Sequence, residues 1–239
     1  MAKKERLDKI LSNLGYGTRK EIKGKIKAGL VKVEGKIIKD SSLKVNPGDS
    51  LIEFNNKEID YRKYIYLLMN KPQGVISATD DNYHKTVIDL IDNEFKAFEP
   101  FPVGRLDKDT EGLLLLTNDG KLAHNLLSPK KHIDKKYYVE VKGELTSKDE
   151  IAFKDGIDIG EKDITLPADL QIISSGKIST GYVTIREGKF HQVKRMFKEL
   201  GKEVVYLKRV SMGELLLDPN LRLGEYRELT TKELEKLNK

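Results

Sequence analysis

A short charged loop stands directly in front of four consecutive leucines. The loop side chains able to do chemistry are those of Arg105, Asp107, Asp109 and Glu111, and the leucines are residues 113–116. The leucine run predicts a buried segment, so the loop sets its carboxylates against an apolar wall. A carboxylate in that position is partly desolvated, and neighbouring cations decide whether it stays ionised. The loop is a candidate for carboxylate chemistry, although a solvated turn before a core strand would show the same pattern.

Residues 107–110 spell D-x-D-x-T, which resembles the nucleophile loop of haloacid-dehalogenase-type phosphatases. In that family the first aspartate follows a central strand of a parallel sheet, and a Mg²⁺ ion lies nearby. Here Pro100 and Pro102 precede the loop, and proline is disfavoured in a central strand. We therefore interpret this match as chance, and a Mg²⁺-dependent phosphatase stays only as an alternative.

The same loop carries oxygen atoms at Asp107, Asp109 and Glu111, as half of a calcium loop does. The bidentate glutamate that such a loop needs at its twelfth position is replaced by Asn118. The chain has four histidines and no cysteine, and none of the histidines forms a short paired spacing with a carboxylate. The sequence also lacks the common nucleotide-binding and hydrolase motifs. We expect neither a metal site nor a cofactor.

Length and composition bound the kind of protein. A chain of 239 residues can form two modest domains, and the lack of cysteine excludes disulfides and thiolate metal sites. No apolar run approaches the roughly 18 residues that a membrane span needs. The start Met-Ala-Lys-Lys-Glu-Arg is not followed by the apolar segment of a signal peptide. We expect a cytoplasmic protein without a membrane partner.

The positive charge is concentrated in the first quarter of the chain. Residues 1–60 hold 14 Lys and Arg against 9 Asp and Glu, which accounts for five of the six net positive charges. Residues 7–14 show helical spacing, and Thr18 with Glu21 forms a capping box that begins a second helix. A cationic row with four-residue spacing on that helix consists of Arg19, Lys23 and Lys27. The row suits a polyanion-binding surface, although many solvated helix faces look the same.

The remaining periodicity predicts a strand-rich mixed domain after a polar linker at residues 55–60. Strands are expected at residues 64–69, 113–117, 137–141, 182–185 and 204–207. Helices are expected at residues 121–127, 147–154 and 191–200, and Thr230 with Glu233 indicates a last capping box. Because this order lacks strict βαβ alternation, it predicts an α+β fold instead of a Rossmann sheet.

Two further segments combine basic and aromatic side chains. In residues 134–139, Tyr137 stands at the start of a predicted strand, where a core tyrosine is the ordinary explanation. Around the start of the helix predicted from residue 191, the side chains able to carry positive charge are Lys189, His191, Lys194 and Arg195. Each segment alone is equally explained by a structural strand or a solvated helix face.

Several motifs of residues 4–55 resemble, in order, the S4-like RNA-binding domain. They are Arg6-Leu7-Asp8-Lys9, Thr18-Arg19-Lys20-Glu21-Ile22, Gly29-Leu30-Val31-Lys32-Val33-Glu34-Gly35 and Pro47-Gly48-Asp49. The resemblance implies that the helix pair binds structured RNA and that the cationic row contacts its phosphates. We expect this small α/β domain at residues 1–58 and a second domain at residues 59–239.

Motifs spread over residues 60–235 resemble those of the RsuA/RluA-type pseudouridine synthases. They are Asn70-Lys71-Pro72-x-Gly74, Gly104-Arg105-Leu106-Asp107, Gly112 to Gly120, Lys135-x-Tyr137 and Gly188-x-x-His191-Gln192-Val193-Lys194-Arg195. The resemblance implies a mixed, mostly antiparallel sheet with flanking helices as the catalytic domain. His191 to Phe197 is most similar to the branch that modifies small-subunit (16S) ribosomal RNA, and an S4-like domain in front is common in the family.

The activity implied by this resemblance is an isomerisation in which a uridine of ribosomal RNA becomes pseudouridine, without a cofactor. The uracil leaves its stack, its glycosidic bond is broken, and it is rejoined to the sugar through C5. Asp107 is then the catalytic aspartate, Tyr137 the stacking partner of the base, and Lys194 the basic partner of the aspartate. Further RNA contacts are expected from Arg105, His191, Gln192 and Arg195. We expect the protein to be a monomer.

Two questions stay open at this point. The sequence does not decide whether Asp107 attacks the sugar C1′, attacks the uracil ring or acts as a base. Many relatives have arginine where this chain has Lys194, and lysine supplies a point charge in place of a planar fork. A non-catalytic RNA-binding or ribosome-assembly factor is the alternative function from a different class, because it would use the same basic surfaces.

Overall fold

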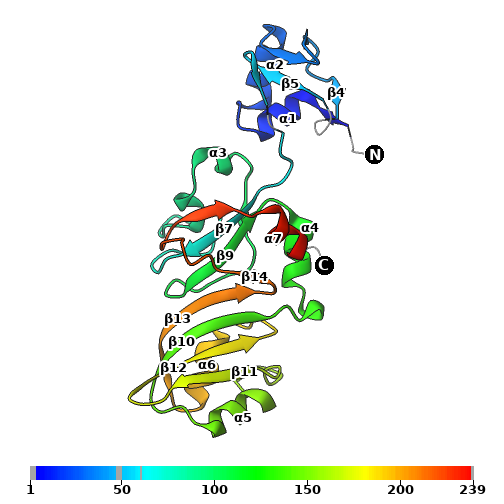
Figure 1. Ribbon diagram of the computed structural model, residues 1–239. Coiled ribbons are helices and arrows are strands. Elements are labelled where there is room, and N and C mark those ends of the chain that lie inside the picture. Colours follow the sequence, from blue (N-terminus) through cyan, green and yellow to red (C-terminus); the bar gives the residue numbers. More distant parts are fainter. Residues whose placement is uncertain (1–3, 47–49, 60, 238–239) are drawn as a thin grey trace. The chain divides into compact units, whose positions relative to one another are not determined.

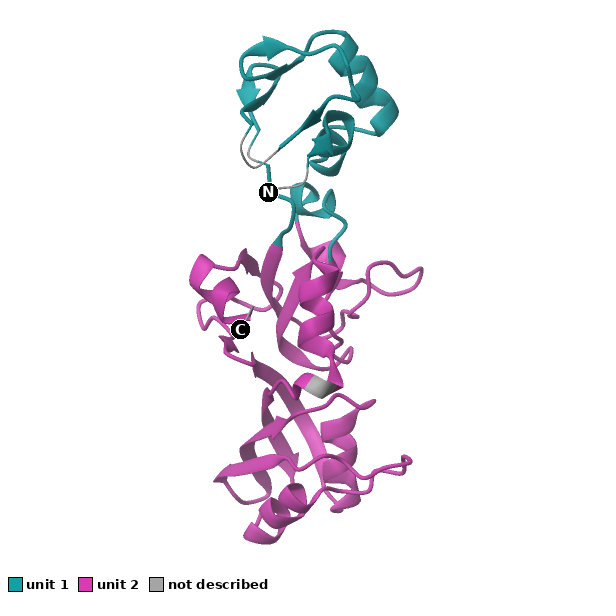
Figure 2. Ribbon diagram, turned by 90° about the vertical axis from the view of Figure 1, so that its right-hand side faces the viewer, with its two compact units in different colours: residues 1–65, 92–100 teal, residues 66–91, 101–239 magenta. Residues whose placement is uncertain are grey.

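A computed structural model of the chain describes residues 4–46, 50–59 and 61–237 (Figure 1). The motif Pro47-Gly48-Asp49 and the last residue of the predicted linker, Asp60, lie outside these residues. The chain divides into two units, which Figure 2 colours separately. Unit 1 comprises residues 1–65 and 92–100, and unit 2 comprises residues 66–91 and 101–239. The described residues contain no helix long and apolar enough to cross a membrane.

The two N-terminal helices of unit 1 form where their apolar spacing predicts them. Helix α1 spans Leu7–Asn13 and helix α2 spans Arg19–Lys27. Thr18 Oγ1 accepts a hydrogen bond from Glu21 N at 3.3 Å, and the Glu21 carboxylate accepts one from Thr18 N at 2.8 Å. This reciprocal pair is the predicted capping box, and it satisfies N–H groups that the start of a helix leaves unpaired.

The strands described in unit 1 are short and antiparallel. Four of them form a sheet in the order β3-β2-β5-β6, and β1 pairs with β4. Their bounds are β1 Glu5–Arg6, β2 Val31–Val33, β3 Lys36–Ile37, β4 Lys44–Val45, β5 Ile52–Phe54 and β6 Lys57–Glu58. Leu7, Ile22, Val31 and Ile52 share one buried core, so both helices pack on this sheet. The short helix α3, Asn93–Lys96, also belongs to unit 1.

A fully buried carboxylate joins the starts of the two helices. Asp8 accepts hydrogen bonds from Arg6 at 3.0 and 2.9 Å and from Arg19 at 3.3 and 3.1 Å. Burial alone would raise the pKa of Asp8, but the hydrogen bonds from both guanidinium groups outweigh it and lower that pKa. Arg19, the first member of the predicted cationic row, therefore also holds an internal ion pair. Lys23 and Lys27 are exposed on the same helix.

The described part of unit 2 is built on one nine-stranded sheet. The strand order is β11-β12-β10-β13-β9-β7-β15, with β14 paired to β13 and β8 paired to β9. The bounds are β7 Tyr66–Lys71, β8 Phe101–Pro102, β9 Glu111–Thr117, β10 Lys135–Lys142, β11 Asp169–Ser174, β12 Ile178–Ile185, β13 Glu203–Met212, β14 Leu215–Leu216 and β15 Tyr226–Glu228. All neighbours are antiparallel except β13 and β9. The predicted α+β fold with a mostly antiparallel sheet is confirmed.

Helix α6 lies on one face of the strands β10, β12 and β13, and α5 lies next to β11 (Figure 1). Phe153 of α5 and Phe197 of α6 are buried against each other, with ring centroids 4.9 Å apart. The helices of unit 2, including two 3₁₀ turns, are η1 Val87–Leu90, α4 Gly120–Leu127, η2 Pro129–Lys131, α5 Ser147–Asp155, α6 Gln192–Glu199 and α7 Thr231–Leu237. Along β10, Tyr137 is buried and Tyr138 is half-buried. Because strand side chains alternate, these neighbours point to opposite faces of the sheet.

The parallel junction between β9 and β13 is a two-residue seam. Glu111 pairs with Lys208, and Gly112 pairs with Arg209. Gly112 has φ +103°, and a Cβ atom there would lie 2.2 Å from the Arg209 carbonyl oxygen. Two side-chain hydrogen bonds brace the seam, from Arg209 Nε to Leu113 O at 2.8 Å and from the Tyr206 hydroxyl to Glu111 at 2.6 Å. Glycine is required because only it fits both the backbone angle and the close approach.

We expect the substitution Gly112→Ala to lower the free energy of unfolding by about 3 kcal/mol, since the methyl group must push the two strands apart. Gly176→Ala is the matched control, because a Cβ atom at Gly176 meets no atom within 4 Å. Chemical denaturation followed by tyrosine fluorescence measures the effect. Equal unfolding midpoints for the two variants would contradict the packing described for the seam.

Candidate active site

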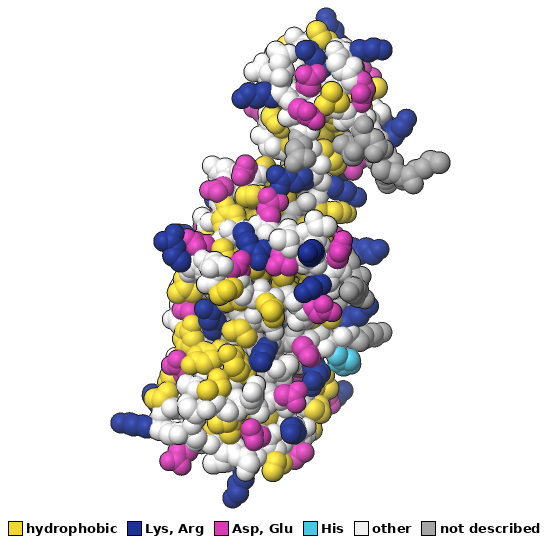
Figure 3. All heavy atoms as spheres, viewed as in Figure 1, with side chains coloured by type: hydrophobic (Ala, Val, Ile, Leu, Met, Phe, Trp, Pro, Cys, Tyr) yellow, Lys and Arg dark blue, Asp and Glu magenta, His cyan; other side chains and the backbone are white. Residues whose placement is uncertain are grey.

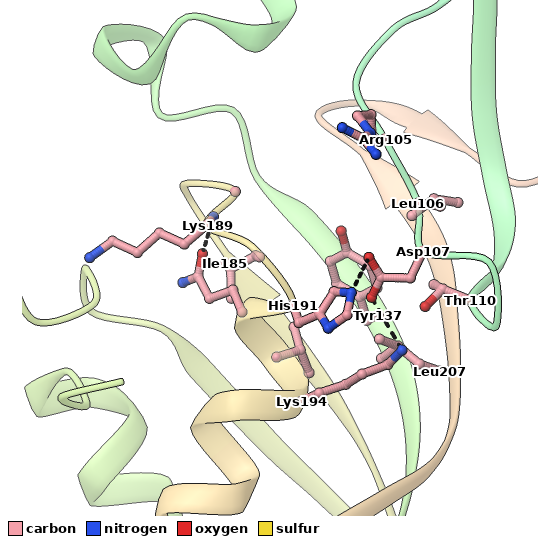
Figure 4. Close-up of a pocket in the computed structure, with 13 residues that line it drawn as sticks. Arg105, Leu106, Asp107, Thr110, Tyr137, Ile185, Lys189, His191, Lys194 and Leu207 are labelled. Atoms are coloured by element: carbon pink, nitrogen blue, oxygen red, sulfur yellow. Dashed lines mark hydrogen bonds and ion pairs between the residues drawn. The ribbon is translucent and has the colours of Figure 1, made fainter. Parts of the chain in front are cut away.

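A small pocket of about 80 Å³ lies where the loop before β9 meets β10 and the start of α6 (Figure 4). It is lined by Arg105, Leu106, Asp107, Thr110, Tyr137, Ile185, Gly188, Lys189, His191, Gln192, Val193, Lys194 and Leu207. The structure thus brings the charged loop together with both basic and aromatic segments that the sequence singled out. Residues far apart in the chain meet here because β9, β13 and β10 are neighbours in the sheet.

Asp107 is the acidic group at the centre of this pocket. Its Oδ2 lies 3.2 Å from Lys194 Nζ, and its Oδ1 lies 3.5 Å from His191 Nε2. The Asp107 side chain is 27% exposed, so the carboxylate is reachable by a ligand while a cation is held beside it. An ammonium at this distance attracts the carboxylate and fixes its direction. The contact is the pairing of Asp107 with Lys194 that the resemblance implied.

Lys194 is shared between two aspartates. Its Nζ also donates a hydrogen bond to Asp109 Oδ1 at 2.5 Å. Burial would raise the pKa of Asp109, but the hydrogen bond and the charge of Lys194 outweigh it and lower that pKa. Asp109 is more exposed than Asp107, so it serves as an outer counter-ion that keeps the lysine at the pocket. The point charge of lysine suits this sharing, because it has no fixed fork to align.

His191 and Tyr137 form two further sides of the pocket. His191 adopts the left-handed conformation, φ 48°, immediately before α6, a conformation that is uncommon for non-glycine residues but that histidine adopts more readily than most. Its ring stacks on the exposed ring of Phe190, with centroids 3.8 Å apart. Tyr137 is 7% exposed and lies beside the Asp107 carboxylate in Figure 4. The pocket therefore offers aromatic surface next to the acid.

The other predicted RNA contacts differ in how free their side chains are. Arg105 is exposed at the pocket rim and lies apart from the Asp107 cluster in Figure 4. Gln192 is buried, donates to Glu187 at 2.9 Å and accepts from Lys189 N at 3.0 Å. Arg195 donates to Glu161 at 2.7 Å and to the carbonyl oxygens of residues 159 and 190. Gln192 and Arg195 thus brace the loops around the pocket, and their direct contact with RNA stays a prediction.

The buried Lys71 holds the loop that carries Asp107, a role that the sequence analysis did not identify. Its Nζ donates hydrogen bonds to the carbonyl oxygens of Pro72, Asp107 and Thr110, each at 3.0 Å. Burial lowers the pKa of Lys71 to about 8. The sequence signal was its place two residues after the apolar run of a predicted strand, because a lysine that is buried there needs hydrogen-bond partners.

Two more contacts from the same segment fix this loop. Ser77 Oγ accepts a hydrogen bond from Leu106 N at 3.0 Å and donates one to Leu106 O at 2.9 Å. Gly74 N donates to Lys108 O at 2.8 Å. The loop backbone on both sides of Asp107 is therefore held before any ligand binds, which is the preorganisation that catalysis requires.

The arrangement does not fit the alternatives taken from the loop sequence. Asp107 follows β8, a two-residue edge strand antiparallel to β9, whereas the phosphatase loop follows a central parallel strand. Among the residues that the structure describes, no group of three His, Asp or Glu side chains could hold a metal ion. The site is a lysine-paired aspartate beside aromatic rings.

Comparisons with known proteins identify the family of the chain. Residues 65–199 match the family described as RNA pseudouridylate synthase, and residues 5–51 match the S4 domain. A Bacillus subtilis protein named "Uncharacterized RNA pseudouridine synthase YtzG" is 54% identical over 98% of both chains. A solved structure described as "Crystal structure of pseudouridylate synthase" is 38% identical, with a TM-score of 0.69, over 97% of this chain and 99% of that chain.

Two relatives with ribosomal names are about equally similar. "Ribosomal small subunit pseudouridine synthase A" of Vibrio cholerae is 39% identical over 96% of this chain and 97% of its own length. "Ribosomal large subunit pseudouridine synthase B" of Bacillus subtilis is 41% identical over 98% of this chain and 95% of its own length. The chain belongs to the RNA pseudouridine synthase family, whose members are isomerases. It carries in addition an S4 domain, an RNA-binding module.

We expect Lys71→Met to lower the free energy of unfolding by about 3 kcal/mol, because three carbonyl oxygens lose their hydrogen-bond donor. Turnover should fall about tenfold or more, because the loop with Asp107 is then no longer held in place. Lys142→Met is the control, since Lys142 lies at an exposed strand end. Thermal melting and single-turnover kinetics measure the two effects. Unchanged turnover would show that Lys71 does not position the loop.

The difference in unfolding free energy between the wild type and Lys71→Met should also depend on pH. The pKa of Lys71 is about 8 in the folded protein and near the ordinary value of 10.5 in the unfolded chain. Between these values the unfolded chain binds more protons, so Lys71 makes the stability of the wild type rise with pH. The difference in unfolding free energy should grow from about pH 8 to about pH 10, and a flat difference would contradict the assignment.

Proposed function

We propose that this chain converts a uridine of small-subunit (16S) ribosomal RNA into pseudouridine, with Asp107 as its catalytic aspartate. The observation that carries the proposal is the Asp107 carboxylate, open to the pocket and held 3.2 Å from Lys194 Nζ beside Tyr137. In the reaction the bond between C1′ and uracil N1 breaks and a bond between C1′ and C5 forms. The proton lost from C5 is balanced by the proton gained at N1, so no cofactor takes part.

The geometry supports a division of labour around the carboxylate. Lys194 holds the Asp107 carboxylate in the pocket, where it can act on the sugar or on the uracil ring. His191 lies 3.5 Å from the other carboxylate oxygen and within reach of the same ligand. Tyr137 supplies an aromatic wall for the base. Each group has a place before the substrate arrives.

A uridine reaches this pocket only after it leaves its stack, which costs a few kcal/mol. Phe190 is 72% exposed next to the pocket and stacks on His191, so it offers a platform for a neighbouring base. Arg105 at the rim would contact the backbone or fill the position that the base has left. These contacts repay the cost of unstacking.

The choice of ribosomal RNA rests on the named relatives, and the choice of subunit rests on the segment His191 to Phe197. The small-subunit and large-subunit relatives are 39% and 41% identical to this chain, so overall identity does not separate the two targets. The segment favours the small subunit because it resembles the branch that modifies 16S ribosomal RNA. On this basis the RNA partner is small-subunit ribosomal RNA.

We expect Asp107→Asn to abolish pseudouridine formation while the dissociation constant for the RNA changes less than about threefold, because phosphate contacts dominate RNA affinity. Asp155→Asn, at an exposed helix end, is the control. Pseudouridine mapping of 16S and 23S ribosomal RNA, with and without the gene, measures the product. Complementation by wild type but not by Asp107→Asn is expected at one 16S site. Loss of a 23S site instead would overturn the subunit assignment.

Charge reversal on α2 tests the RNA-binding role of unit 1. Lys23→Glu with Lys27→Glu should weaken RNA binding by about tenfold or more and reduce the salt dependence of the binding constant. Lys232→Glu with Lys236→Glu on α7 makes an equal change in net charge at the same spacing. Filter binding at several salt concentrations measures both pairs. Equal effects of the two pairs would mean that net charge, and not the cationic row, attracts the RNA.

A further inference from the structure

A second pocket, of about 270 Å³, lies on the opposite face of the sheet from Asp107. We call it the far-face pocket; the residues that matter most are Asn70, Tyr138, Tyr182 and Lys208, and Val210, Leu217 and Leu221 add apolar wall. Its place follows from strand alternation, because Tyr138 and Lys208 neighbour Tyr137 and Leu207 of the catalytic pocket. Figure 3 views this face and shows hydrophobic side chains gathered over β10 and β13.

Asn70 lines this pocket with a buried amide side chain. The residue is 3% exposed, and its Nδ2 donates to Leu221 O at 2.8 Å. Its Oδ1 has no hydrogen-bond partner among the described protein atoms. The backbone N of Asn70 donates to Glu225 O, and its carbonyl oxygen accepts from Gly224 N, so the side chain is held in place. A buried acceptor of this kind is costly unless a donor meets it.

Aromatic rings form the wall above this acceptor. The rings of Tyr138 and Tyr182 lie edge to face, with centroids 5.9 Å apart at 67°. Lys136 Nζ lies 4.4 Å from the centre of the Tyr182 ring. Tyr206 continues the cluster, with its centroid 6.1 Å from that of Tyr138. A planar group can stack on such rings at little entropic cost.

The charges at the pocket indicate where an anionic group would bind. Lys208 lines the pocket, and Lys136 lies next to Tyr182. Asp218 also lines it, but its carboxylate accepts hydrogen bonds from Arg227 Nε at 2.7 Å and from Asn220 N at 2.9 Å. The hydrogen bond from Arg227 lowers the pKa of Asp218. The two lysines therefore attract an anion on their side of the pocket, and Asp218 repels it from the other.

We propose that the far-face pocket binds an unpaired nucleobase of the RNA substrate, distinct from the uridine that is modified. A nucleotide combines a planar ring, which can stack on Tyr138 or on Tyr182, with a phosphate for Lys208. Bases of a duplex keep their faces stacked, so the ligand is a single-stranded segment. This inference rests on RNA being the substrate, and it extends the RNA contact to the face opposite Asp107.

The test measures RNA affinity and turnover with the full-length protein. Tyr138→Leu with Tyr182→Leu removes both rings and should raise the dissociation constant for a 16S fragment by about tenfold or more, with unchanged turnover at saturating RNA. Tyr138→Phe with Tyr182→Phe keeps the rings and should bind as the wild type does. Ile151→Ala, an exposed position on α5, is the control for apolar surface loss.

A second variant and a second probe keep the test decisive. If the leucine pair does not fold, Lys208→Ala should still weaken RNA binding. Ultraviolet cross-linking of the wild type to the fragment should yield RNA attached to Tyr138 or Tyr182. Titration with the four nucleoside 5′-monophosphates distinguishes a base of the RNA from a free nucleotide.

The outcomes separate cleanly. Unchanged RNA affinity in the leucine pair, or in Lys208→Ala where that pair does not fold, would overturn the proposal. If the leucine pair lost the binding of nucleoside monophosphates but kept its RNA affinity, the proposal would also be overturned, because the pocket would then be a site for free nucleotides. A different result would contradict the proposed function: a wild-type protein that leaves the uridines of 16S ribosomal RNA unmodified. That result does not depend on how the leucine pair binds RNA.

Discussion

The geometry of the Asp107 pocket depends on the two-residue parallel contact between β9 and β13. The loop with Asp107 enters β9 on one side of this seam, and Tyr137 and Lys194 stand on the elements beyond its other side. The seam is short, because two residue pairs form it whereas eight pairs join β10 to β12. The close approach at Gly112 and the side-chain hydrogen bonds of Arg209 and Tyr206 hold it together. An error of about 1 Å at such a site costs a large share of the rate. The 3.2 Å contact between Asp107 and Lys194 is therefore a property of the seam as much as of the two side chains.

Backbone contacts from one segment hold the aspartate loop in place. Lys71, Gly74 and Ser77 reach it in turn, and each bonds to the main chain on one side of Asp107 or the other. A buried ammonium is costly, and three carbonyl oxygens offset that cost here. The carboxylate itself is left free to meet the substrate, because the protein holds its backbone and aims its side chain with Lys194. The backbone of Asp107 is thus held rigidly, while its carboxylate stays accessible from the pocket.

Local patterns in the sequence predicted most elements and the main site residues, and long-range packing accounts for what they did not predict. The capping box at Thr18 and the buried run of β9 depend on neighbours in the chain, so the sequence shows them directly. β7 begins two residues and β12 four residues away from the predicted starts, and β11 was not predicted, because pairing with neighbouring strands sets such limits. The roles of Lys71 and Gly112 depend on partners 36 or more residues away. The same holds for Arg195, which the sequence offered as a cation for RNA and the fold uses to hold a loop.

Strand β10 carries the aromatic wall of the catalytic pocket on Tyr137 and that of the far-face pocket on Tyr138. Point substitutions can change either wall while leaving the other intact, so the two surfaces are free to evolve separately. An inserted or deleted residue within the strand would exchange the faces and damage both pockets at once. The pairing between β10 and β13 is irregular at two places, where Val210 and Val205 of β13 have no partner on β10. Differences in length are therefore absorbed in β13 and not in β10. Among descendants of this chain, β10 should therefore vary in composition while keeping a constant length.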